Sequence, residues 1–224
     1  TEKKGLFPNT KWKKNNLGKG WVLGETLITG IGQGYIQTTP LQLCMMTAQI
    51  ANGGFAVKPK IIVDSNPISY EDAKQSMESG LLFDTDSEKL LDKKLFKNQK
   101  NIRIVQEAMF ASTNERFGTS YKSRIDDPKY QFAGKTGTAQ VKRISKRERE
   151  LDLELEQIPY KDRDHALYVA YGPYVNPRYA LSIIVEHGGS GSKAAAPIAK
   201  KLFKLIIDRH ELRNKQSNFE RITV

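Results

Sequence analysis

The sequence has a single cysteine, only three histidines and no long apolar run. Cys44 has no partner for an internal disulfide, and its apolar neighbours favour a packed small side chain over a redox centre. No segment approaches the roughly 18 consecutive apolar residues that cross a bilayer. His165, His187 and His210 are not spaced as metal ligands, so we expect no metal and no other cofactor.

An initiating methionine and a visible signal peptide are also missing, since the sequence begins at Thr1. We therefore expect a processed or truncated chain, with any export signal or membrane anchor upstream of it. The 224 residues suffice for one large domain, and 38% apolar with 27% charged residues is an ordinary globular composition.

Acidic residues are in the minority, because 36 Lys and Arg face 25 Asp and Glu, a formal net charge of +11. Such an excess suits nucleic acid, anionic lipid or an acidic polymer as a partner, and equally a lysine-rich proteome. The basic residues are scattered outside residues 1–14 and 142–150, and no zinc-finger, RNP-like or helix-turn-helix pattern accompanies them. We expect no nucleic-acid partner.

Glycine and proline punctuate the first quarter of the chain. Residues 1–20 are predicted to be a loop, and the four glycines at 24, 30, 32 and 34 predict a tightly folded turn. A helix is predicted over residues 40–50, with Thr38 or Thr39 as its cap and Asn-Gly-Gly at 52–54 as its end. Because this helix is apolar nearly all round, we expect it to be buried at the centre of the fold.

Helical periodicity recurs twice more, and a short helix is predicted near residues 87–97. One helix is predicted over residues 99–117, closed by Gly118, and another over residues 192–212. Their predicted inner faces consist of Ile102, Val105, Ala108 and Met109 in the first and of Ile198, Leu202, Leu205 and Ile206 in the second.

Three runs have the β-branched and aromatic content of strands, at residues 130–141, 165–175 and 178–187, and one or two short strands are predicted over residues 55–63. The last two of the three runs are joined at Asn176-Pro177 as in a hairpin. A charged excursion at about 142–164, helical in part, separates the first two. An antiparallel sheet flanked by helices is the predicted architecture, which makes the fold class α+β.

The first of these strands contains AGKTGTAQV, residues 133–141. A glycine inside a strand often marks close approach by another backbone or by a ligand, so Gly137 suits a peptide-like ligand lying alongside. Lys135 would bring a positive charge to a carboxylate, or to a hydroxyl whose proton must move. Thr136 and Thr138 would offer hydroxyl and backbone N–H donors to the same ligand.

Lys-Thr-Gly at 135–137 is one of the marks of serine β-lactamases and penicillin-binding proteins. Residues 30–54, GIGQGYIQTTPLQLCMMTAQIANGG, resemble the segment before that motif in class B penicillin-binding proteins, where a Gly-Gln-Gly turn leads into a buried helix. Residues 163–189 resemble the two strands that follow the motif. The chain is thus similar to this family, above all to its elongation-type members, and residues 1–224 are expected to be the C-terminal part of a transpeptidase domain.

The resemblance implies a peptidoglycan D,D-transpeptidase that crosslinks stem peptides through a serine acyl-enzyme and that β-lactams inhibit. It implies the site residues as well. Lys135 and Thr138 are expected to be catalytic, and Thr136, Gly137, Thr138, Ala139 and Gln33 are expected to bind substrate.

The family's nucleophile motif S-x-x-K and its S-x-N motif normally precede the Gly-Gln-Gly segment. Ser190 to Lys193 fits the first pattern, but it follows Lys-Thr-Gly, and we interpret it as a capping turn. Ser112 to Asn114 fits the second pattern, but it lies near the end of a predicted helix, and a structural role is favoured. The chain is therefore expected to lack the nucleophile and to be inactive alone.

The resemblance also implies a partner and a location. The partner would be a membrane-embedded glycan polymerase of the rod-elongation system, and the location the periplasmic face of the inner membrane. Two other interpretations stay open at this point. One is a β-lactamase or β-lactam sensor domain, and the other is a non-catalytic basic module that binds a polyanion.

Overall fold

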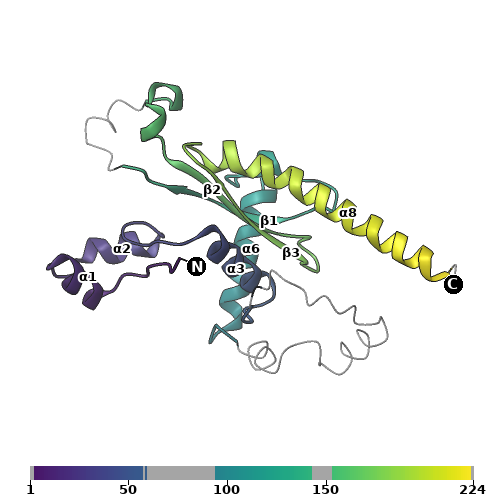
Figure 1. The fold of residues 1–224 in the computed structure, drawn as a ribbon, viewed down its shortest axis with the longest axis horizontal. Coiled ribbons are helices and arrows are strands. Elements are labelled where there is room, and N and C mark those ends of the chain that lie inside the picture. Colours follow the sequence, from purple (N-terminus) through teal and green to yellow (C-terminus); the bar gives the residue numbers. More distant parts are fainter. Residues whose placement is uncertain (1–2, 58, 60–93, 143–152, 223–224) are drawn as a thin grey trace.

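The computed structural model describes residues 3–57, 59, 94–142 and 153–222 (Figure 1). Its centre is an antiparallel sheet in the order β1-β2-β3, formed by β1 (Ala133–Ala139), β2 (His165–Gly172) and β3 (Tyr179–Val185). In the register, Lys135 lies opposite Val169, which in turn lies opposite Ser182. The three predicted strands and the α+β class are confirmed.

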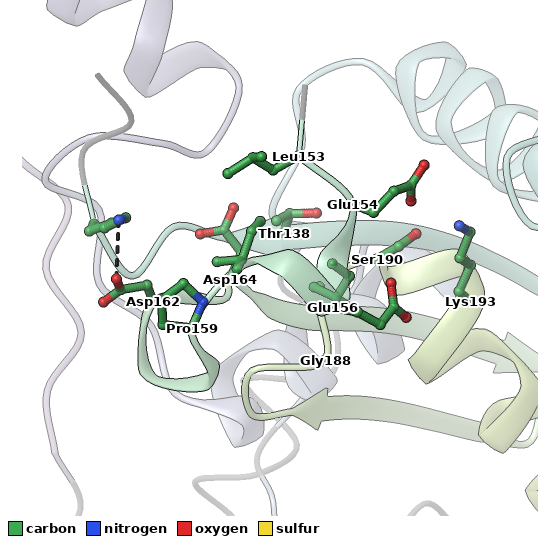
Figure 2. Close-up of a pocket in the computed structure, with 14 residues that line it drawn as sticks. Thr138, Leu153, Glu154, Glu156, Pro159, Asp162, Asp164, Gly188, Ser190 and Lys193 are labelled. Atoms are coloured by element: carbon green, nitrogen blue, oxygen red, sulfur yellow. Dashed lines mark hydrogen bonds and ion pairs between the residues drawn. The ribbon is translucent and has the colours of Figure 1, made fainter. Parts of the chain in front are cut away.

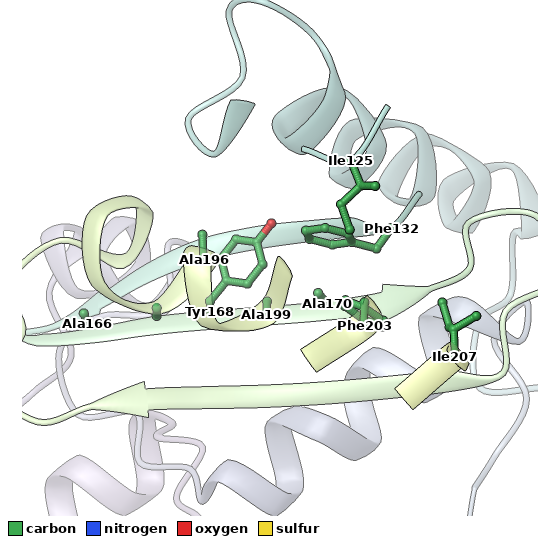
Figure 3. Close-up of a cluster of buried hydrophobic side chains, with 10 residues drawn as sticks. Ile125, Phe132, Ala166, Tyr168, Ala170, Ala196, Ala199, Phe203 and Ile207 are labelled. Atoms are coloured by element: carbon green, nitrogen blue, oxygen red, sulfur yellow. The ribbon is translucent and has the colours of Figure 1, made fainter. Parts of the chain in front are cut away.

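Helix α8 (Ala196–Ile222) packs on one face of the sheet, after a π-helical turn at Gly191–Ala195 (Figure 1). Alanines of β2 and α8 let these two elements approach closely. Phe203 stacks on Phe132 with ring centroids 4.8 Å apart. Figure 3 shows this core, whose labelled members are Ile125, Phe132, Ala166, Tyr168, Ala170, Ala196, Ala199, Phe203 and Ile207.

The predicted inner face of α8 is wrong. Ile198 and Leu205 are 39% and 64% exposed, whereas Ala199, Phe203 and Ile207 are buried. The helix carries apolar residues on more than one side, so periodicity alone does not fix its rotation. The sheet selects the stripe that combines small alanines with one large aromatic ring.

Helices α3 (Pro40–Ala51) and α6 (Gln99–Asn114) pack against the opposite face (Figure 1). The predicted cap of α3 is confirmed, because the Thr39 hydroxyl accepts from the Gln42 N–H and Pro40 occupies the first turn. The expected full burial of α3 is wrong. Thr47 is its one fully buried residue and Met46 is 42% exposed, because the sheet covers a single side of the helix.

The predicted face of α6 is half right. Ile102 and Met109 are buried, but Val105 and Ala108 are exposed, and the buried stripe continues to Thr113. The polar Thr113 side chain was not assigned to the interior because its burial depends on a hydroxyl partner from the sheet.

Two helices occupy the predicted loop and the first part of the predicted turn, whereas the turn itself is confirmed at residues 31–35, with positive φ at Gly32 and Gly34. Helix α1 (Thr10–Leu17) is capped by Asn9 and ends at Gly18, whose φ is 64°. Helix α2 (Leu23–Gly30) follows, and Glu25 in its first turn forms an ion pair of 2.5 Å with the buried Lys13. The caps of α1 are local signals, but residues 10–17 have only Trp12 and Leu17 as apolar residues, so the sequence shows no helical periodicity there.

Other predictions fall wholly or partly outside the described residues. The short helix near 87–97 lies mostly there, as does much of the strand at 55–63, where Phe55 forms an isolated bridge to Lys94. The described part of the charged excursion contains two short 3-10 turns, Leu155–Gln157 and Tyr160–Asp162. In the described parts of the chain, no helix combines the length and apolarity needed to cross a membrane.

Candidate active site

Strand β1, which carries Lys-Thr-Gly, is an edge strand, because among the described residues it pairs with β2 alone. Three alternate carbonyl oxygens on its open side accept hydrogen bonds from side chains: Gly134 from Thr113 Oγ1 (3.5 Å), Thr136 from Lys135 Nζ (2.8 Å) and Thr138 from Gln33 Nε2 (2.8 Å). The carbonyl of Phe132, just before the strand, accepts from Asn114 Nδ2 (3.0 Å). The N–H and C=O of one strand residue point to the same side. The Thr138 N–H therefore also faces the open edge.

Gln33 joins the Gly-Gln-Gly turn to this strand. Gly32 and Gly34 adopt φ of 77° and 83°, which glycine accommodates without strain, and the Gln33 N–H bonds to the Ile28 carbonyl at the end of α2. The turn thereby directs the Gln33 amide at the Thr138 carbonyl, across 105 residues of sequence. Gln33 and Thr138, both predicted site residues, are therefore in direct contact.

The remaining predicted residues divide between the two faces of β1. Side chains alternate along a strand, and a Cβ on Gly137 would lie 3.2 Å from Leu167 Cβ, on the face of α3 and α6. Lys135 and Ala139 share that face, whereas Thr136 and Thr138 belong to the face of α8. Lys135 is exposed, and its Nζ also lies 3.4 Å from Thr136 Oγ1, so lysine and threonine meet at the open edge.

Thr138 borders two hollows. The smaller one, of about 320 Å³, lies between β1 and the Gly-Gln-Gly turn and is lined by Gln33, Ala139 and Leu167 among others. Figure 2 shows the larger one, of about 700 Å³, with Thr138 at its wall. Its charged lining consists of Glu154, Glu156, Asp162, Asp164, Lys142 and Lys193. In the described part of the chain, no three His, Cys, Asp or Glu side chains are placed to hold one metal ion.

Ser190 lies in the larger hollow, close to the strand, and it begins the π-helical turn before α8. Its Oγ is 2.9 Å from Ser192 Oγ, and its carbonyl accepts from the Lys193 and Ala194 N–H groups. Ser190 stands at the N-cap position of this turn, but the predicted side-chain cap is wrong, because its hydroxyl accepts from no backbone N–H of the turn. Within the described parts of the chain, Ser190 Oγ has a side-chain hydrogen bond only with Ser192 Oγ, and a hydroxyl is a poor general base.

Asn114, from the S-x-N look-alike, has a structural role. Its amide donates to the carbonyls of Phe110 and Phe132, which ties the end of α6 to the residue before β1. Ser112 Oγ lies instead 3.3 Å from Thr119 Oγ1, which is 3.3 Å from Thr136 Oγ1. Thr119 was not among the predicted site residues. Its only sequence signal is its place directly after Gly118, where the predicted helix ends.

Residues 2–204 match the penicillin binding protein transpeptidase domain. The chain belongs to this family. Among curated relatives it is 31% identical over 208 residues to the peptidoglycan D,D-transpeptidase MrdA of Salmonella typhimurium, covering 91% of this chain and 30% of that protein. It is 32% identical over 201 residues to MrdA of Acinetobacter baumannii, covering 88% and 27%. The chain thus spans about 30% of the length of these relatives.

Solved structures of penicillin-binding protein 2 resemble the chain as well. The Pseudomonas aeruginosa protein in complex with WCK 5153 is 33% identical with a TM-score of 0.67, covering 91% of this chain and 38% of that one. The Helicobacter pylori protein in complex with MreC is 32% identical with a TM-score of 0.66, covering 92% and 32%. The class B, elongation-type resemblance is confirmed. The β-lactamase, sensor and polyanion-binding alternatives are not favoured.

Proposed function

We propose that residues 1–224 are the C-terminal part of the transpeptidase domain of a peptidoglycan D,D-transpeptidase, and that they supply one wall of its serine acyl-transfer site. One observation carries the proposal: the Lys-Thr-Gly strand is an open sheet edge whose Thr138 carbonyl is held by Gln33. An edge so arranged presents fixed backbone and side-chain donors to a ligand that lies beside it.

The ligand we propose is a peptidoglycan stem peptide in extended form. An extended peptide can bind beside an exposed strand edge through the main chain. Here the main-chain donors include the Thr138 N–H, since the Thr136 and Thr138 carbonyls already accept from Lys135 and Gln33. Gly137 leaves room for the approach. Thr136 and Thr138 are exposed or half-buried at that edge and would bind the terminal carboxylate, and Gln33 and Ala139 would line the neighbouring hollow.

The proposed chemistry is acyl transfer in two steps through a serine that lies upstream of this chain in an S-x-x-K motif. Its Oγ attacks the penultimate D-Ala carbonyl, the bond to the terminal D-Ala breaks, and that residue leaves as a protonated amine. An amine of a second stem peptide then attacks the ester. A crosslink forms, and the serine recovers its proton.

In this scheme the chain's own residues stabilise charge and move protons. The Thr138 N–H, on the open edge, would donate to the oxyanion of the tetrahedral intermediate. Loss of one such donor commonly lowers kcat by about 10²–10³. The Lys135 ammonium, exposed beside Thr136 Oγ1, would attract the substrate carboxylate and help the serine proton move.

The proposal extends to inhibitors, partners and location. β-Lactams would acylate the same serine, because their carboxylate and ring carbonyl imitate the D-Ala-D-Ala terminus. A membrane glycan polymerase of the rod-elongation system would supply the strands to be crosslinked. An anchor upstream of this chain would hold the domain at the periplasmic face of the inner membrane.

The test uses the full protein with Lys135→Ala, and Lys100→Ala as the matched control, since Lys100 is an exposed lysine at the start of α6. Lys135→Ala should slow acylation by a fluorescent penicillin about 10²-fold or more, within the range for groups that transfer protons or stabilise transition-state charge. Lys100→Ala should leave the acylation rate unchanged. Equal acylation rates in the two variants would overturn the assignment of the site.

A further inference from the structure

A line of hydroxyl groups runs from the end of α6 to the open edge of β1. Ser112 Oγ is 3.3 Å from Thr119 Oγ1, Thr119 Oγ1 is 3.3 Å from Thr136 Oγ1, and Lys135 Nζ is 3.4 Å from the same Thr136 oxygen. Thr119 is exposed. Its placement therefore does not come from burial of its own side chain.

The neighbours of Thr119 hold it in place on both sides. A Cβ on Gly118 would lie 2.4 Å from the Ser112 carbonyl oxygen, so only glycine lets the chain turn so close to the end of α6. On the other side, the Ser120 N–H and hydroxyl both donate to that carbonyl, at 3.0 and 2.9 Å. The segment Gly118 to Ser120 is thus fastened to the last turn of the helix.

Beneath this segment lies a buried hydroxyl cluster, formed by Thr113, Ser120 and Tyr168. Tyr168 Oη is 2.9 Å from Thr113 Oγ1 and 3.1 Å from Ser120 Oγ, and all three side chains are at most 1% exposed. Burial raises the pKa of Tyr168, while the hydrogen bonds with Ser120 and Thr113 lower it. A satisfied buried network of this kind fixes its members rigidly, and here it ties the α6 end, the sheet and Ser120 together.

Thr136 has one hydroxyl proton, and this hydroxyl can bind an anion only if that proton points toward the anion. The proton is free to do so when other donors occupy the acceptor positions of the Thr136 oxygen. Lys135 is one such donor and Thr119 is within range to be the second. A chain of donors also polarises each successive hydroxyl, which strengthens the last bond in the series.

We propose that Thr119 is a positioning residue, whose hydroxyl donates to Thr136 Oγ1 and thereby directs the Thr136 proton at the carboxylate of the bound stem peptide or β-lactam. This inference rests on the proposed function. It assigns to Thr119 a role in recognising the carboxylate, and none in the covalent steps.

The test is made in the full protein with Thr119→Val, which keeps the shape and removes the hydroxyl, and with Thr119→Ser, which restores it. The acylation efficiency with benzylpenicillin should fall roughly two- to tenfold in Thr119→Val, the effect of one neutral hydrogen bond. Thr119→Ser should match the wild type. With the uncharged methyl ester of benzylpenicillin, Thr119→Val and the wild type should differ by less than twofold, because no carboxylate remains to be recognised.

A double-mutant cycle with Thr136→Val separates a positioning role from a general structural one. In the Thr136→Val background, Thr119→Val should cause no further loss. Two outcomes would overturn the positioning role. One is a Thr119→Val loss of the same size in the wild-type and Thr136→Val backgrounds, and the other is a loss with the methyl ester as large as that with benzylpenicillin. If neither Thr136→Val nor Lys135→Ala slowed acylation, the proposed function itself would fail, and that outcome is distinct from a loss confined to Thr119.

Discussion

Gly134 is the residue at which β1 approaches the buried hydroxyl cluster most closely. A Cβ at this position would lie 2.4 Å from Tyr168 Oη and 2.5 Å from its Cζ. Gly134→Ala must therefore displace the Tyr168 ring and break its hydrogen bond with Thr113. We expect the free energy of unfolding to fall by about 1–3 kcal/mol, as for other overpacked cores, and chemical denaturation of the full protein would measure it.

Gly137→Ala is the matched control on the same strand. Its Cβ would lie 3.2 Å from Leu167 Cβ, a tight contact that a shift of a few tenths of an ångström relieves. Gly137→Ala should therefore keep more of the stability than Gly134→Ala, yet lose acylation rate because the methyl group, beside Leu167, narrows the smaller hollow next to Thr138. Equal destabilisation by the two substitutions would contradict this distinction.

At the scale of elements, the rotation of α8 is set by the sheet, and a pair of substitutions tests it. Phe203 is fully buried, whereas Leu205, two residues further on, is 64% exposed. Phe203→Ala should lower the free energy of unfolding by about 3–5 kcal/mol, and Leu205→Ala should change it by less than about 0.5 kcal/mol. Thermal or denaturant unfolding measures both. A larger loss for Leu205→Ala than for Phe203→Ala would instead support the inner face that periodicity predicted.

The existence and order of the main elements could be predicted from sequence, but their rotation could not. The cap at Thr39 and the glycines at 53 and 54 are local signals, so the bounds of α3 were predictable. The buried faces of α6 and α8 depend on the sheet that each helix meets. Helix α1 has local caps at Asn9 and Gly18 but no apolar periodicity, so its sequence resembles that of a loop.

The candidate site was predictable only where its residues lie close together in the sequence. Lys135, Thr136 and Thr138 are adjacent in one motif, so their proximity needs no tertiary information. Gln33 was included through resemblance alone, and its contact with the Thr138 carbonyl appears only when the turn and strand are folded together. The place of Thr119 in the site cannot be predicted locally, because it depends on a contact with the Thr136 hydroxyl, 17 residues further along the chain.

At the scale of the whole molecule, we propose that an acyl-transfer site is divided between two parts of one protein. The described residues provide the open edge, the turn that holds it and the hydroxyl line that reaches it. The chain spans about 30% of the length of its curated relatives. We propose that the serine and its activating lysine belong to the remainder.

The most direct measurement is the intact mass of the 224-residue chain after incubation with a fluorescent penicillin, beside that of the protein extended upstream to include its S-x-x-K segment. We predict no covalent adduct on the 224-residue chain and one adduct per molecule on the extended protein, located on the upstream serine. An adduct on Ser190 or Ser112 of the short chain would contradict the account, because the nucleophile would then lie within these residues. Failure of the extended protein to form any adduct would contradict the proposed acyl-transfer function.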